Sequence, residues 1–344
     1  MRQYIAHITL VVREYERKRH RLCAGTLRTL FILVALPALA QTSIPAHDPV
    51  MIRQGNRYYM FCTGNGITVW SSPDRRHWEK EPPVFSAAPA WAAATIPGFR
   101  GHIWAPDISY HNGLYYLYYA VSAFGKNTSC IGVATNKTLD HTAPGFKWTD
   151  HGKVVQSVPG RDMWNAIDPN LVFDENNVPW LAFGSFWNGI KLVKLADSLT
   201  AMAKPEQWYS VAARTRTANI PDTLAGDAAI EAPFIFKKGG YYYLFVSFDY
   251  CCRGPASTYK IMVGRSKKLT GPYVDRNNIP MLQGGGTLVL QGNAQWYGVG
   301  HNAAYTWDGK DYIIFHGYDA ADKGRAKLQV RELDWDKEGW PLVR

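Results

Sequence analysis

Short apolar runs separated by turn residues fill most of the chain, and the same unit recurs five times. In each copy a polar residue precedes a short apolar run, a turn follows, and a second run rich in Tyr, Phe or Leu completes a hairpin. The clearest copy reads Ile167-Asp-Pro-Asn-Leu-Val-Phe173, then the turn Asp174–Asn177, then Val178-Pro-Trp-Leu-Ala-Phe183. Aromatic and β-branched residues suit a pleated, half-buried surface, so each pair of runs predicts two antiparallel strands.

The polar residues that precede the first strand of each copy are regularly spaced. By subtraction their intervals are 59, 61, 63 and 70 residues, for Asp48, Asp107, Asp168, Glu231 and His301. A regular period of all-strand units indicates a repeat architecture, and a β-propeller uses about four strands per blade. The sequence therefore predicts an all-β fold, a five-bladed β-propeller, that takes up residues 41–344 as one domain.

Two segments between the units lack a strand pattern. Residues 86–101 are rich in Ala, Pro and Gly, which predicts a long surface loop. Residues 200–226 are polar and without periodicity, which predicts an irregular excursion from the third blade. No helix of three turns is expected after residue 40.

The N-terminus has the features of a secretory signal peptide, predicted over residues 1–40. A basic stretch precedes the apolar run Leu30–Leu36, and Ala38-Leu-Ala40 reads as a cleavage site. The run is too short to span a bilayer comfortably, so the mature protein is expected to be secreted or periplasmic and free of the membrane. An uncleaved anchor or a misassigned start codon are the alternatives.

The charge distribution argues against a nucleic-acid partner, and the spacing of the cysteines argues against a structural zinc site. Net charge is +10, and +5 of it falls in the first 40 residues, where seven Arg and Lys face two Glu. The rest has no basic run, so no nucleic-acid partner is expected. The four cysteines after the signal have no metal-site spacing, which argues against a structural zinc. Buried free thiols are favoured for Cys62, Cys130, Cys251 and Cys252, with disulfides left open.

The repeated polar positions suggest an enzyme site at one end of the channel. The innermost strand of each blade lines a propeller's channel, so four carboxylates and one histidine would converge there. One Asp at a turn is ordinary, but clustered carboxylates raise one another's pKa and are more often functional. A carboxyl pair suits glycoside hydrolysis, with Trp and Tyr as platforms for sugar rings. The chain lacks the GxxxxGK[ST] and GxSxG motifs of phosphoryl and acyl transfer.

At these positions the sequence resembles glycoside hydrolase family 43, and within it the arabinan endo-1,5-α-L-arabinosidases. The resemblance covers nearly all of residues 41–344. The motifs that carry it are His47-Asp-Pro49, Trp104-Ala-Pro-Asp107, Asn165-Ala-Ile-Asp-Pro169, Phe183–Leu192, Ile230-Glu-Ala-Pro233 and Ser247–Gly254. Gly-Ser-Phe-Trp and Asp-Tyr-Cys-Cys-Arg-Gly are the stretches most particular to arabinanases.

The resemblance implies inversion at the anomeric carbon and three catalytic acids. Asp48 would be the general base that activates water, and Glu231 the general acid. Asp168 would orient Glu231 and tune its pKa. Asp107 is not one of the three, and a structural role is favoured for it. By the same resemblance His301 would hold calcium or another ion in the central channel, although a channel histidine without metal is the reading from sequence alone.

The resemblance also places five residues along the substrate cleft: Phe124, Gly125, Asn165, Ser185 and Trp187. Phe124 and Trp187 could instead be blade core.

The function expected from these residues is an exported monomer that cleaves internal α-1,5-L-arabinofuranosidic bonds in the arabinan side chains of pectin. An exo-acting arabinosidase, an α-L-arabinofuranosidase or a β-xylosidase of the same fold are alternatives. An alternative of another class is a non-catalytic carbohydrate-binding propeller. The presence of Asp48, Asp168 and Glu231 together argues against it, because a binding module need not keep all three.

Overall fold

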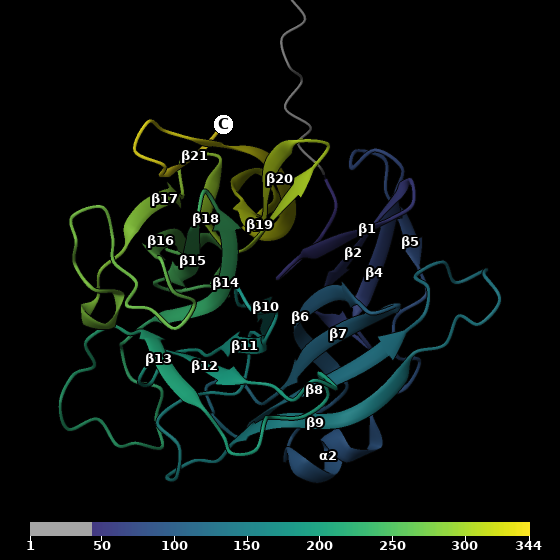
Figure 1. Cartoon of the computed structure of the whole chain (residues 1–344), viewed down its shortest axis with the longest axis horizontal. Helices are drawn as coiled ribbons and strands as arrows, with labels where there is room; N and C mark the ends of the chain where they lie inside the picture. Colours follow the sequence, from purple (N-terminus) through teal and green to yellow (C-terminus); the bar gives the residue numbers. More distant parts are fainter. Residues whose placement is uncertain (1–42) are drawn as a thin grey trace, which may run out of the picture. The chain divides into compact units, whose positions relative to one another are not determined.

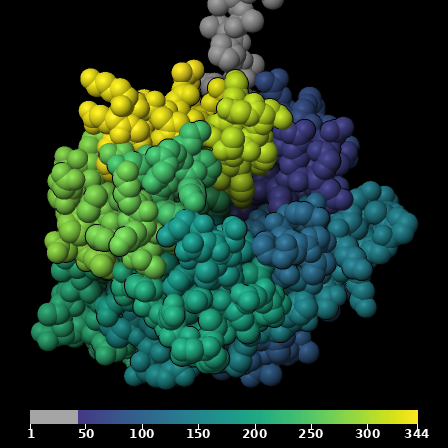
Figure 2. All heavy atoms as spheres, in the orientation of Figure 1, coloured from purple at the N-terminus to yellow at the C-terminus, as the bar shows by residue number. Residues whose placement is uncertain are grey.

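The structure, a computed structural model, describes residues 43–344, which form five antiparallel sheets around a centre (Figure 1). The predicted signal peptide, residues 1–40, lies outside the described residues. The first strand of each main hairpin lies toward the centre and the later strands lie outward. Figure 2 shows one face, on which the chain's colours follow one another around the molecule from purple to yellow. The predicted five-bladed β-propeller is confirmed.

Each blade is a consecutive segment of the chain apart from one short strand. Blade one contains β1 (Val50–Gln54), β2 (Arg57–Cys62), β4 (Thr68–Ser72) and β5 (Glu79–Glu81). Blade two contains β3 (Gly64–Asn65), β6 (His102–His111), β7 (Leu114–Val121), β8 (Ser129–Asn136) and β9 (Thr149–Ser157). Blade three contains β10 (Asn170–Phe173), β11 (Pro179–Phe183), β12 (Ile190–Lys194) and β13 (Trp208–Ala212).

Blade four contains β14 (Ile230–Lys238), β15 (Tyr241–Phe248), β16 (Lys260–Ser266) and β17 (Thr287–Gln291). Blade five contains β18 (Trp296–Trp307), β19 (Lys310–Asp319), β20 (Arg325–Trp335) and β21 (Pro341–Val343). The helical elements are α2 (Ala90–Thr95) and the short 3-10 turns η1 (Gly254–Ala256), η2 (Met281–Gln283) and η3 (Ala320–Asp322).

The second strand of each hairpin is the most apolar because neighbouring blades cover both of its faces. Strand β7 is buried at every position but its first, and β11 at all five positions. The large side chains Phe61, Tyr119, Phe245 and Phe315 from β2, β7, β15 and β19 are almost completely buried. Burial on both faces replaces the alternating pattern by a continuous apolar run, as the sequence shows.

Two expectations about irregular segments need correction. The segment 86–101 contains a helix, α2, whose Ala92 is buried, so it is not loop throughout. The polar segment 200–226 contains β13, the outer strand of blade three, paired with β12. An outer strand packs on few neighbours and needs no apolar pattern, so periodicity did not reveal it. None of the described helices is long and apolar enough to cross a membrane.

The repeats are in a different register from the one expected. Each blade has one residue with φ between 42° and 59° just before or inside its first strand: Asp48, Ala105, Asp168, Ala232 and His301. Proline follows this left-handed residue in four blades. Asp48, Asp168 and His301 are therefore equivalent, whereas Glu231 lies one residue before this position and Asp107 two residues after it. The β-bulges in β6, β14 and β18 fall at these residues.

The ring closes through the N-terminal residues. Ala46 N–H donates to the Ala326 carbonyl at 3.3 Å, and Leu328 N–H donates to the Ile44 carbonyl at 3.0 Å. Residues 44–46 thereby pair with β20 of the last blade while β1 begins the first. A ring closed in this way keeps the ends of the inner strands of all five blades in fixed positions.

Candidate active site

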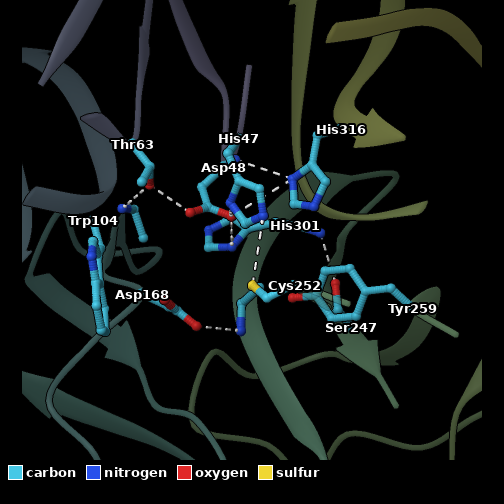
Figure 3. A network of polar contacts seen from close by, with 12 residues as sticks. His47, Asp48, Thr63, Trp104, Asp168, Ser247, Cys252, Tyr259, His301 and His316 are labelled. Atoms are coloured by element: carbon cyan, nitrogen blue, oxygen red, sulfur yellow. Dashed lines mark hydrogen bonds and ion pairs between the residues drawn. The ribbon is translucent and has the colours of Figure 1, made fainter. Parts of the chain in front are cut away.

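Asp48 lies at the centre of a buried polar network (Figure 3). Its Oδ1 atom lies 2.9 Å from Nδ1 of His47 and 3.0 Å from Nδ1 of His301. Its Oδ2 atom accepts a hydrogen bond from Thr63 Oγ1 at 2.5 Å, and Thr63 Oγ1 accepts one from Ala105 N–H at 2.8 Å. Because the Thr63 hydroxyl accepts from Ala105, its own proton points at Asp48. The carboxylate is fixed in orientation and still has lone pairs for a further donor.

These contacts keep Asp48 ionised. Burial raises the pKa of its carboxyl, but the positive charges of His47 and His301, with their hydrogen bonds, hold that pKa well below its usual value. Burial lowers the pKa of the two histidines, and the charge of Asp48 outweighs it, raising the pKa of His301 to about 9. Asp48 is therefore a carboxylate at neutral pH, balanced by imidazolium groups.

His316 is a neutral support for this network. Asp48 N–H donates to its Nδ1 at 3.1 Å, so Nδ1 has no proton, and Nε2 lies 3.2 Å from the Tyr318 hydroxyl. Its ring stacks on His47 with centroids 4.0 Å apart. Burial, and then the charge of His47, lower its pKa well below the usual value.

Glu231 is buried in a different environment. Its Oε2 accepts a hydrogen bond from Ser185 Oγ at 2.8 Å, and its Oε1 accepts one from the Tyr259 hydroxyl at 2.8 Å. Burial raises the pKa of the Glu231 carboxyl, and these two hydrogen bonds reduce the rise without cancelling it. A carboxyl with a raised pKa can hold a proton near neutral pH and give it to a ligand.

Asp168 is a third buried carboxyl, electrostatically linked to the other two. Burial raises its pKa to about 8; His301 lowers it, while the charges of Glu231 and Asp48 raise it. Its Oδ2 accepts a hydrogen bond from Ala232 N–H at 3.0 Å. Figure 3 shows Asp168 below Asp48, with the Trp104 indole beside it. The three acids predicted from sequence thus belong to one electrostatic unit.

The left-handed residues share one kind of partner. In four blades the N–H of the left-handed residue donates to a side chain of the preceding blade: Asp48 to His316, Ala105 to Thr63, Ala232 to Asp168 and His301 to Ser247. A buried N–H needs a partner, and here the partner is polar and adjacent to the acids. The same hydrogen bonds therefore hold the turns and position the site.

Asp107 belongs to a second set of links between blades. Its Oδ2 accepts a hydrogen bond from Leu171 N–H at 2.8 Å, and Asn170, its equivalent in blade three, accepts one from Ile235 N–H at 2.8 Å. Burial raises the Asp107 pKa to about 7. The structural role favoured for Asp107 agrees with these contacts.

The five expected cleft residues differ in exposure. Phe124 is 80% exposed, so it is not core, and Gly125 follows it in the same loop. Asn165 is buried, and its Oδ1 has no hydrogen-bond partner among the described residues. Ser185 contacts Glu231 directly. Trp187 is 1% exposed, with its indole N–H bound to the Asp222 carbonyl at 2.7 Å, which supports the alternative that it is core.

Sequence reasoning did not single out three residues that contact the acids: Thr63, Tyr259 and His316. They are single hydroxyl or imidazole groups within apolar strands or turns, and their partners lie 15, 28 and 268 residues away. Ser247, the first residue of the motif Ser247–Gly254, was given no role, and it accepts a hydrogen bond from His301 N–H. Buried free thiols were favoured for four cysteines. Cys62 and Cys130 are free and buried, but Cys251 is half-buried and Cys252 is exposed, with Sγ 3.7 Å from His47 Nε2. A hydrogen bond from Cys251 lowers the Cys252 pKa to about 5.

The residues around His301 fit a hydrated ion when its ring is neutral, with the one proton on Nδ1 facing Asp48 and a lone pair on Nε2. Among the described residues, no hydrogen bond is formed by Nε2 of His301 or by either amide atom of the buried Asn302 beside it. Such groups need a partner, which water or an ion could supply. The described residues also include one cluster with metal-ligand spacing, His47, Asp48 and His316, within 4.8 Å of one another. Nδ1 of His316 already accepts from Asp48 N–H, so this cluster is a hydrogen-bonded network.

Comparison with known proteins finds sequence relatives and solved structures of the same fold. The model of glycosyl hydrolases family 43 matches residues 42–341. An extracellular exo-α-(1→5)-L-arabinofuranosidase of Cellvibrio japonicus is 53% identical over 92% of this chain and 91% of that protein. An extracellular endo-α-(1→5)-L-arabinanase of Bacillus subtilis is 43% identical over 86% of each chain. The structure of Cellvibrio cellulosa α-L-arabinanase complexed with arabinohexaose has a TM-score of 0.86 and 54% identity, covering 88% of this chain and 96% of that one.

Proposed function

The chain belongs to glycosyl hydrolases family 43, and on this premise we propose that it hydrolyses α-1,5-linked arabinan with inversion at the anomeric carbon. The observation that carries the proposal is the contrast between two buried carboxyls. Imidazolium neighbours keep Asp48 ionised, whereas burial raises the pKa of Glu231 toward the protonated form. A base and an acid held in opposite protonation states are what inverting glycoside hydrolysis requires.

In the proposed reaction Asp48 takes a proton from a water molecule as the water oxygen bonds to the anomeric carbon. Glu231 gives its proton to the glycosidic oxygen as that bond breaks. Asp168 supports Glu231 through its hydrogen bond to Ala232 N–H, and the two carboxyls are coupled, so ionisation of one disfavours ionisation of the other.

We infer exo action, with the endo action expected from sequence as the second candidate. The exo-acting relative shares 53% identity with this chain, while the endo-acting relative shares 43%. Endo action is the second candidate because the similarity to the endo-acting relative also extends over 86% of the chain. Both modes use the same acids, so the difference lies in whether surface loops close one end of the cleft.

Incubation of the mature protein with linear α-1,5-arabinan tests both points. Proton NMR at the start of the reaction is expected to show new β-anomeric ends, and α-anomeric ends would contradict inversion. A single short product from the first minutes supports exo action, and a ladder of oligosaccharides supports endo action. Glu231→Gln and Asp48→Asn are each expected to lower kcat by about 10²–10⁴-fold. Unchanged activity in either variant would show that the substituted residue is not the proposed acid or base.

The ion and the export of the protein are also proposals. A hydrated calcium or similar ion bound at Nε2 of a neutral His301 would supply the positive charge near the three acids in place of the imidazolium. Dialysis against a chelator, followed by metal analysis and thermal melting, tests the proposed ion: a bound metal and a lower melting temperature after its removal are expected.

Export by the signal peptide over residues 1–40 is supported by relatives named as extracellular. N-terminal sequencing of the secreted protein should begin near Gln41.

A further inference from the structure

A hollow of about 600 Å³ opens beside the outer strands of blades two and three, and its lining includes none of the three acids. It lies between β9 and the segment that leads into β13, the last strands of neighbouring blades in Figure 1. The side chains that matter for its chemistry are Gln156, Arg161, Asp162, Trp164, Glu206 and Trp208. This site is called the rim hollow below.

Two indole rings give the rim hollow a rigid aromatic wall. Trp164 and Trp208 are half-buried, with ring centroids 5.3 Å apart. Each also packs edge-on against the buried Phe183, at 5.4 and 6.0 Å. The core of blade three therefore holds both rings in place while part of each stays accessible. Rigid aromatic rings of this kind bind the apolar face of a ligand with little loss of entropy.

The polar groups of the hollow are paired with one another and reach solvent. Arg161 donates to the Asp162 carboxylate through Nε at 3.0 Å and through Nη2 at 2.6 Å. Glu206 accepts a hydrogen bond from the Trp208 indole N–H at 2.9 Å. Gln156 Oε1 accepts one from Lys153 Nζ at 2.6 Å. Accessible donors and acceptors beside aromatic rings are typical of binding sites for small polar ligands.

The charges of the lining favour a neutral ligand. Lys153 and Arg161 are balanced by Asp162 and Glu206, so the lining has no net charge. A site for an anionic polymer would show an excess of Lys and Arg instead. Neutral rings with several hydroxyl groups match both the aromatic wall and the paired donors and acceptors.

The rim hollow is joined to the catalytic site by a short, anchored segment. Trp164 precedes Asp168 by four residues, so their Cα atoms are at most about 14 Å apart. Asn127 Nδ2 holds this segment by donating to the carbonyls of Asp162 at 2.8 Å and of Trp164 at 3.3 Å. One polysaccharide chain can contact both places at once, whereas a ligand that fills only the catalytic site gains nothing from the rim hollow.

We propose that the rim hollow is a second, non-catalytic binding site for the arabinan chain. The proposal rests on the proposed function, since arabinan is the neutral polymer that the enzyme meets. A second contact on one polymer raises its effective concentration at the catalytic site. The rim hollow therefore increases activity on long chains and leaves activity on short oligosaccharides unchanged.

Binding is measured first, without catalysis, by electrophoresis of Glu231→Gln protein in gels that contain linear arabinan. Trp208→Ala and Gln156→Ala in that background are expected to weaken retention about three- to tenfold. The matched control is Tyr110→Ala, which removes an exposed aromatic ring that does not line the hollow. Gln156→Ala keeps the test valid if Trp208→Ala fails to fold. Retention equal to that of the control in both variants would overturn the proposal.

Activity is measured second, in proteins that keep Glu231. The two variants are expected to lower kcat/KM about three- to tenfold on the polymer and leave it unchanged on arabinotriose. Equal losses on both substrates would overturn the proposal, because they indicate a disturbed catalytic site. If gels that contain polygalacturonate retain the protein and gels that contain arabinan do not, the proposal that the hollow binds a neutral polymer is wrong. If the wild-type protein hydrolyses no arabinan, the proposed function is wrong. If it hydrolyses arabinan and the two variants behave like the wild type, only the proposal of a second binding site is wrong.

Discussion

The Asp168 carboxylate accepts a hydrogen bond at 3.0 Å from the N–H of Ala232, the residue that follows Glu231. Ala232 has a φ of 57°, a left-handed conformation that disfavours a residue with a Cβ atom. The hydrogen bond therefore stabilises the turn that carries Glu231. Asp168 acts on Glu231 through this turn and through the electrostatic coupling of the two carboxyls.

Two substitutions at Asp168 separate these effects. Asp168→Ala removes the acceptor, and we expect kcat to fall about 10²-fold, since a misplacement of about 1 Å has that cost. Asp168→Asn keeps an oxygen for Ala232 N–H but loses the ionisable carboxyl that is coupled to Glu231. We expect the melting temperature to fall clearly in the Ala variant and little in the Asn variant, while kcat falls in both. Equal melting temperatures for the two variants would show that the hydrogen bond from Ala232 N–H to residue 168 does not stabilise the turn.

The hydroxyl of Tyr259 should set the pH range of Glu231, the proposed general acid. Burial raises the Glu231 pKa, and the Tyr259 hydrogen bond lowers it because it stabilises the carboxylate. Tyr259→Phe should therefore raise that pKa further. An acid must be protonated to act, so the alkaline limb of the kcat/KM profile should move to higher pH.

Tyr273→Phe is the control for the Tyr259 prediction. Tyr273 is as buried as Tyr259, but its hydroxyl donates to the Leu269 carbonyl and contacts none of the acids. Its pH profile should match that of the wild type. A Tyr259→Phe profile that does not move, or that moves to lower pH, would contradict the role of Glu231 as the acid.

The fold could be predicted from sequence because its signal is repeated. Apolar hairpins with turn residues occur five times, and one misread copy would not have changed the conclusion. The register within each copy was harder. Glu231 and Asp107 are carboxylates near the start of a strand, but the left-handed residues beside them are Ala232 and Ala105. Backbone conformation defines the equivalence, and alanine gives no sign of it in a sequence.

The acids of the site could be named, but their environment could not. Asp48 and Asp168 stand in Asp-Pro motifs, which the resemblance made specific. The groups that decide their charge come from other blades. His316 is 268 residues from Asp48, and nothing in the sequence pairs them. Protonation states depend on such contacts, so they had to come from the structure.

Thr63 links two blades through one hydroxyl. It donates to Asp48 at 2.5 Å and accepts from Ala105 N–H at 2.8 Å. Thr63→Val keeps the shape and removes both hydrogen bonds. We expect a loss of stability of about 1–3 kcal/mol, because the N–H of Ala105 loses its partner. Denaturant unfolding measures this, and Thr63→Ser, which keeps the hydroxyl, should recover most of it. A Val variant as stable as wild type would show that the Ala105 N–H finds another partner.

The N-terminal residues 43–46 should stabilise the whole ring through their pairing with β20. Removing them takes away the hydrogen bonds of Ala46 and Ile44 to that strand, each about 0.5–1.5 kcal/mol. The protein that begins at residue 47 should therefore melt several degrees below the protein that begins at residue 43. Ile44→Ala keeps both backbone bonds and should lose less. Equal melting temperatures for the two lengths would mean that contacts such as Met51 N–H to the Tyr305 hydroxyl, at 3.0 Å, close the ring alone.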